Sequence, residues 1–148
     1  MSIDMCSDEI QQLENAALQA EAQGRFQEAL NFNTQLLEEF DENHSVMLEK
    51  DVLERISFIH IIQKQFGDAL KYQERICEIN EQIFTFGERV MPHPLLSIQL
   101  YQLAKIQLHL KMDEQATVTL QRVLSHMEPI LSMKSQFDGK MIDEPLLN

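Results

Sequence analysis

The amino-acid sequence predicts an all-α protein built from three antiparallel helical hairpins. Apolar residues recur every three or four positions through most of the chain, as they do on the buried face of a helix. The strict alternation that marks strands is not sustained anywhere. Three short segments also align with one another, GRFQEAL at 24–30, KQFGDAL at 64–70 and KMDEQAT at 111–117, and each opens a helix that follows another helix.

The first hairpin is predicted over residues 8–40, with helices near 8–22 and 26–40. Gly24 stands at the tight connection, where a residue of left-handed conformation commonly ends a helix. The second helix carries one apolar stripe, formed by Phe26, Ala29, Leu30, Leu36, Leu37 and Phe40. Residues 1–7 are predicted to be a flexible N-terminus.

The second hairpin is predicted over residues 47–86, with helices near 47–63 and 66–86. Gly67 lies near its connection. The apolar stripe of its second helix consists of Phe66, Ala69, Leu70, Ile76, Cys77, Ile83 and Phe84. Because Cys77 belongs to this stripe, we interpret it as a small core residue rather than a nucleophile.

The third hairpin is predicted over residues 94–132, with helices near 94–110 and 113–132. It begins at the sequence Pro-His-Pro, in which Pro94 suits the first helical position and His93 lies near the helix cap. His93 is therefore interpreted as structural rather than catalytic. Asp113 is placed to cap the last helix. Residues 133–148 are predicted to form a loose C-terminal tail.

Small residues recur at matching points of the three hairpins. Alanines stand 40 and 47 residues apart in the aligned segments, and a small residue precedes each by twelve positions, namely Ala29, Ala69 and Ala116 with Ala17, Ser57 and Ala104. Small side chains at facing positions allow two helices to approach closely. The spacing is also typical of helical repeat arrays.

The helix at 94–110 is apolar almost all round. Six leucines, two isoleucines and one tyrosine leave it no wide polar face, and such a helix is normally covered on more than one side. It is predicted either to be sandwiched within the chain or to be covered by something that the chain does not supply.

The net charge of −12 is concentrated in the first third of the chain. Residues 1–49 hold eleven acidic side chains and one basic side chain, for −10, whereas the remainder carries −2. Such a field repels phosphate backbones and anionic lipid, so neither nucleic acid nor membrane is expected as a partner. A basic protein surface suits it, and an acidic face that serves only solubility is the alternative.

Enzymatic chemistry is not predicted for this chain. Two cysteines, Cys6 and Cys77, indicate a reduced intracellular setting, cytoplasmic and/or nuclear. His60 and His109 lack a second ligand at helical spacing, so no metal site is expected. Phosphate-binding G-x-x-x-x-G-K-[ST] and nucleophile-elbow G-x-S-x-G motifs are absent, and no catalytic residue or cofactor is predicted.

The pattern of Leu13, Ala17, Gly24, Phe26 and Ala29 resembles the tetratricopeptide repeat (TPR), an α-solenoid unit. The resemblance implies a TPR-like domain at 8–132, in which the first helix of each pair lines a concave binding surface. That surface would include Glu14, Leu18, Glu21, Asp51, Glu54, Phe58, Tyr101, Lys105 and His109. Acidic and apolar side chains together favour a basic amphipathic segment as ligand.

Residues 50–132 are similar to the C-terminal helical domain of the SMYD lysine methyltransferases. The likeness rests on Pro92-His93-Pro94, on Lys105 to His109 and on Met112 to Ala116. Two cysteines cannot supply a MYND zinc finger, and the strands and glycine-rich loops of a SET domain are missing. The resemblance therefore implies a non-catalytic interaction module that packs beside a catalytic domain. The alternatives are a free-standing adaptor of the kinesin-light-chain type and a fragment of a lysine methyltransferase.

Overall fold

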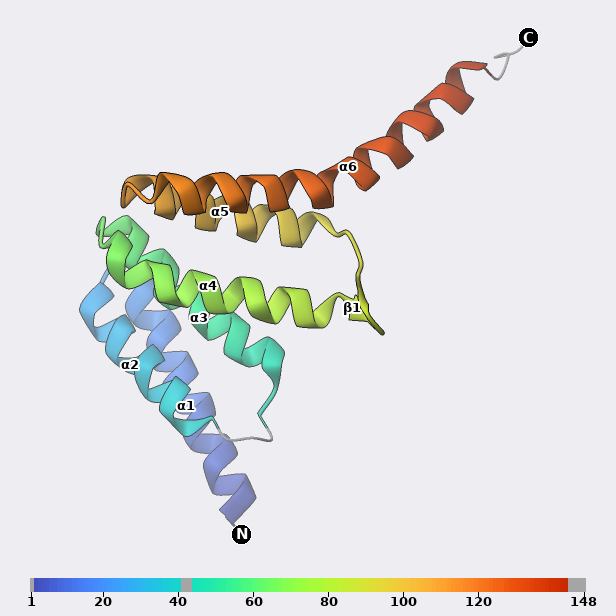
Figure 1. Cartoon of the computed structure of the whole chain (residues 1–148). Coiled ribbons are helices and arrows are strands. Elements are labelled where there is room, and N and C mark those ends of the chain that lie inside the picture. The colour runs from blue at the N-terminus through green and yellow to red at the C-terminus, as the bar shows by residue number, and fades with distance from the viewer. Residues whose placement is uncertain (1, 41–43, 144–148) are drawn as a thin grey trace. The chain divides into compact units, whose positions relative to one another are not determined.

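Helices make up most of the computed structural model, which confirms the predicted all-α fold. It describes residues 2–40 and 44–143, with side chains for 8–40 and 44–132. The helices in these ranges are α1 (Ser2–Ala22), α2 (Phe26–Glu39), α3 (Val46–Ile62), α4 (Phe66–Ile83), α5 (Pro94–His109) and α6 (Asp113–Asp143) (Figure 1). The chain divides into two compact units, residues 1–76 and residues 77–148.

The helix bounds follow the prediction closely except at the two ends of the chain. α1 begins at Ser2, inside the segment that was expected to be a flexible N-terminus. α6 continues to Asp143, well into the predicted tail, and includes Gly139, which was expected to belong to that tail. Residues 144–148 of that tail lie outside the described residues. Pro129 is inside α6, which is bent along its length in Figure 1.

Each hairpin turns through the same backbone motif. In the first, the Arg25 amide donates to the Ala20 carbonyl and the Gly24 amide to the Glu21 carbonyl, the two bonds of a Schellman cap. The same pair of bonds closes α3 at Lys64 and α5 at Lys111. Gly24, Lys64 and Lys111 all have positive φ, of 73°, 59° and 61°. The connecting role that Gly67 was expected to share therefore belongs to Lys64, and Gly67 lies in the first turn of α4.

The first unit is held together by a core between α1, α2 and α3. Its buried members are Ala17, Ala20, Ala29, Leu30, Leu36, Val52, Ile56 and Ile59. All six small residues that were predicted to lie where two helices approach closely are buried. Ala17 lies on α1, Ala29 on α2 and Ser57 on α3. α1 packs against α2, and α2 packs against α3. The repeat positions read from the sequence are therefore packing positions.

In the second unit, α5 and α6 lie side by side, and a short β-hairpin precedes them (Figure 1). α4 ends at Ile83 rather than near residue 86, and Thr85–Phe86 (β1) pairs with Arg89–Val90 (β2) in antiparallel register. Gly87 opens the two-residue loop with a φ of 67°, a conformation that glycine adopts without steric cost. This turn, which the helical periodicity hid, ends α4. Asp113 is the first residue of α6 rather than its cap.

Buried polar pairs join the helices of the second and third hairpins. The Ser57 hydroxyl lies 3.2 Å from Gln73 Oε1 between α3 and α4. The Thr119 hydroxyl lies 2.7 Å from Gln107 Oε1 between α5 and α6. Each pair satisfies polar atoms that would otherwise be costly to bury. Because the partners stand on facing helices, each pair also fixes how its two helices align.

Candidate interaction surfaces

The predicted concave surface divides between the two units. Six of its nine residues lie on α1 and α3 of the first unit, and Tyr101, Lys105 and His109 lie on α5 of the second. The six are Glu14, Leu18, Glu21, Asp51, Glu54 and Phe58, and we refer to them as the α1–α3 face. Within each of the three helices, these residues are three or four positions apart and so lie on one face of that helix.

Arg55 joins the two helices of the α1–α3 face. Its Nη2 donates to Glu14 Oε1 at 3.1 Å, across 41 residues of sequence. Both side chains are mostly shielded from solvent, with exposed fractions of 19% and 24%. Glu14 is therefore a structural residue as well as a surface residue, and its replacement would disturb the approach of α1 to α3.

Large apolar side chains are exposed on the same face. Phe58 is 60% exposed and Leu18 45%, although both lie one helical position from fully buried neighbours. Asp51, seven residues before Phe58 on α3, is exposed as well. A phenylalanine that is mostly in water on a rigid helix is a typical anchor for a partner protein.

Two carboxyl groups of this face are partly withdrawn from water. Burial raises the pKa of Glu21 above its ordinary value of 4.5, and the positive charge of Arg55 only partly offsets this. Burial likewise raises the pKa of Glu54, opposed by Lys50, whose Nζ lies 3.7 Å away, and reinforced by the negative charge of Asp51. Both carboxylates would gain from a further cation, because a cation restores the favourable interaction that burial removes.

In the second unit, the predicted residues of α5 line up on an exposed face. Lys105 Nζ lies 5.2 Å from the centre of the Tyr101 ring, a cation–π distance. Tyr101, Lys105 and His109 are all exposed, as is Ile98, which precedes Tyr101 by three residues. This face is apolar and basic, in contrast to the acidic α1–α3 face.

The apolar side chains of α5 are buried on one side of the helix and exposed on others. One side, including Leu96, Leu100, Leu103 and Ile106, is buried. On other sides, Ile98 and Leu108 remain 59% and 49% exposed. The described residues of the chain therefore cover α5 on one side and leave these side chains in contact with solvent.

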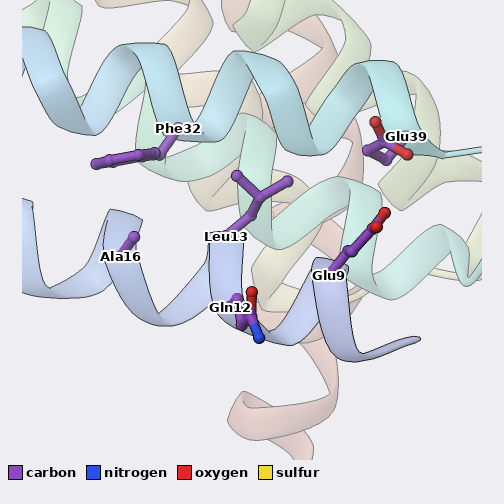
Figure 2. A pocket seen from close by; sticks show the side chains of 6 residues that line it. All are labelled: Glu9, Gln12, Leu13, Ala16, Phe32 and Glu39. Carbon is purple, nitrogen blue, oxygen red and sulfur yellow. The ribbon is translucent and has the colours of Figure 1, made fainter. Parts of the chain in front are cut away.

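The sequence did not predict a cleft that lies between α1 and α2. It has a volume of about 400 Å³ and is lined by Glu9, Gln12, Leu13, Ala16, Phe32 and Glu39. Figure 2 shows Ala16 and Phe32 toward one end and the carboxyl groups of Glu9 and Glu39 toward the other. The available signal was the seven-residue spacing of Glu9 from Ala16 and of Phe32 from Glu39, which puts each pair on one helix face.

Of the side chains that were considered for catalysis or metal binding, His93 caps a helix, Cys77 is buried and His60 stacks on an aromatic ring. His93 Nδ1 accepts a hydrogen bond from the Leu95 amide at 3.1 Å and caps α5, and its ring stacks on Phe84 with centroids 4.2 Å apart. Cys77 is buried, as predicted, and the side chain of Cys6 lies outside the described residues. His60 stacks on Tyr72. Among the described side chains, no group of three or more His, Cys, Asp or Glu is arranged to hold a metal ion.

No described helix combines the length and the apolar character needed to cross a membrane. Comparison with protein families and with curated proteins gave no match to this chain.

Proposed function

We propose that the chain is a non-catalytic protein-interaction module, and that its α1–α3 face binds a basic, partly apolar segment of another protein. The observation that carries the proposal is the exposure of Phe58 and Leu18 among the carboxyl groups of Glu21, Asp51 and Glu54. Apolar contact supplies affinity, and the acidic surround selects a partner that carries lysine or arginine.

The charge distribution supports the same choice of partner. Residues 1–49 carry −10, and the α1–α3 face adds acidic residues from α3 to those of α1. A basic segment that docks here would bring further cations to Glu21 and Glu54, whose pKa values burial raises and whose neighbours Arg55 and Lys50 only partly offset that effect. The resemblance to the SMYD helical domain is compatible with this role, since it implies a module that lies beside a catalytic domain and shapes the access of a basic protein substrate.

The proposal is tested with a labelled helical peptide of leucine and lysine, compared with the same peptide in which glutamate replaces lysine. Fluorescence anisotropy should show binding of the basic peptide only. Phe58→Ser should weaken that binding tenfold or more, because a buried phenylalanine contributes about 1.5–3 kcal/mol. Phe86→Ser, at a phenylalanine that is 66% exposed on β1, is the matched control and should leave the affinity unchanged.

Glu14 is unsuitable for this test because of its ion pair with Arg55. Asp51→Lys avoids that difficulty, since Asp51 is exposed, and should also weaken the binding of the basic peptide. Equal binding of the acidic and basic peptides, or an equal loss in Phe58→Ser and Phe86→Ser, would contradict the proposal.

A further inference from the structure

We propose that the cleft between α1 and α2 is a second docking site, which takes one apolar side chain and one lysine or arginine from a helical segment of another protein. It is distinct from the α1–α3 face, because none of the six residues of that face lines it. The inference therefore extends the proposed function and does not depend on it.

The size and lining of the cleft suit side chains. Its volume of about 400 Å³ lies within the range of about 300–1,000 Å³ that ligand sites occupy. Leu13, Ala16 and Phe32 give it an apolar wall, and the small side chain of Ala16 leaves space opposite the Phe32 ring (Figure 2). An aliphatic or aromatic anchor fits this end.

The other end is acidic. The carboxyl groups of Glu9 and Glu39 come from different helices and point toward the same space in Figure 2. Both side chains are exposed, and neither forms an ion pair with a described residue. A cation between them would interact with both, whereas an anion would be repelled.

The separation of the two ends sets the spacing required of the partner. With a rise of 1.5 Å per residue, Glu9 lies about 6 Å along α1 from Leu13, and Glu39 about 10 Å along α2 from Phe32. On a helix that lies along the cleft, residues four or seven positions apart span the same distances. The partner is therefore a helix with an apolar anchor and a basic residue at one of these spacings.

A second copy of the chain is a poorer occupant. Each copy carries a net charge of −12, and residues 1–49 contain Arg25 as their one basic residue. Two such surfaces repel one another. Charge complementarity therefore selects a different, basic protein.

The test uses the full chain with Phe58→Ser, so that the α1–α3 face does not contribute. The probe is an alanine-based helical peptide with leucine and lysine four residues apart, and binding is followed by the backbone amide NMR signals of Ala16 and Phe32. The peptide with glutamate in place of lysine should not shift these signals. The peptide with serine in place of leucine should bind at least tenfold more weakly.

Matched variants separate the cleft from the general acidity of the unit. Glu9→Gln with Glu39→Gln should weaken binding about fivefold, because two exposed ion pairs are lost. Asp8→Asn with Glu38→Gln makes the same charge change at the adjacent positions of the same helices, outside the cleft lining, and should change the affinity less than twofold. Ala16→Phe, which fills the apolar end without changing charge, should weaken binding at least tenfold.

Three results would overturn the proposal. Equal losses in the two double variants would mean that only long-range charge acts. Unchanged affinity in Ala16→Phe would mean that the anchor does not enter the cleft. Concentration-dependent dimerisation of the chain that shifts the Ala16 and Phe32 signals without any peptide would assign the site to a second copy.

Discussion

Lys64 and Lys111 hold left-handed backbone conformations, and replacement of each by glycine is expected to stabilise the protein. They occupy the position that Gly24 occupies in the first hairpin, with φ of 59° and 61° against 73°. The left-handed conformation costs a non-glycine residue about 1–2 kcal/mol. Glycine avoids that cost but loses about 0.4–1 kcal/mol more conformational entropy on folding. Each replacement should therefore raise the free energy of unfolding by about 0.5–1 kcal/mol.

The two effects should add, because the lysines stand 47 residues apart in different units and have no shared partner among the described residues. The double variant should gain about 1–2 kcal/mol, which raises the melting temperature by about 3–6 °C. Circular dichroism at 222 nm during heating, with urea titration for the free energy, measures both quantities.

Gly24 and Gly67 provide controls of opposite sign. Gly24→Ala should lower the free energy of unfolding by about 1 kcal/mol, purely through its positive φ, since a Cβ there meets no atom within 4 Å. Gly67→Ala should raise it by about 0.5–1 kcal/mol, because Gly67 lies in α4 and a Cβ there is also unobstructed. Destabilisation by Lys64→Gly, or the same sign for the two alanine variants, would refute the reasoning.

Three further predictions concern capping, buried polarity and pH. His93→Ala should lower the free energy of unfolding by about 2 kcal/mol, because α5 loses both its cap and the ring stack on Phe84. His93→Asn keeps a capping side chain and should lower it by about 1 kcal/mol. Equal losses for the two variants in urea titrations would show that the cap contributes nothing. Asn80→Leu should raise the melting temperature, because both polar atoms of this buried side chain lack a partner among the described residues. Asn33→Leu is the control. It should raise the melting temperature less, because the Asn33 amide donates to the Ala29 carbonyl at 2.9 Å. Burial raises the pKa of Glu54 in the folded chain above the unfolded value of 4.5. Between the unfolded and the folded pKa, the folded chain therefore binds more protons than the unfolded chain. The free energy of unfolding consequently falls as pH rises through that window. Glu54→Gln should reduce this decline in urea titrations from pH 4 to 7, with the remainder due to Glu21, whose pKa burial also raises, and an unchanged pH profile would count against the assignment.

Much of the backbone followed from local sequence. The helix bounds came from apolar periodicity, and they were displaced mainly where a different local signal acted. Gly87 supports a tight β-turn that ends α4 early, whereas α6 continues past residue 132 and through Gly139 to Asp143. The capping role of His93 followed from the proline that comes after it, because Pro94 sets the first helical position.

The sequence could not specify the surfaces, because these depend on how one helix is rotated and placed against another. Periodicity placed Leu18 and Phe58 on particular faces but did not show that their exposure would survive packing. Nothing local linked Glu14 to Arg55 across 41 residues. The cleft between α1 and α2 likewise exists only because Ala16 faces Phe32 from another helix.

By itself, then, the sequence determined the all-α class, the three hairpins, the small residues at their contacts and the acidity of the first third. Each of these depends on residue type and on spacing along one segment of the chain. Only the tertiary structure decided which carboxylates are partly buried, which aromatic side chain stays in water, and which lysines stand in the left-handed turns. Those properties arise from contacts between segments far apart in sequence, or from the backbone geometry that the turns adopt once their helices have packed.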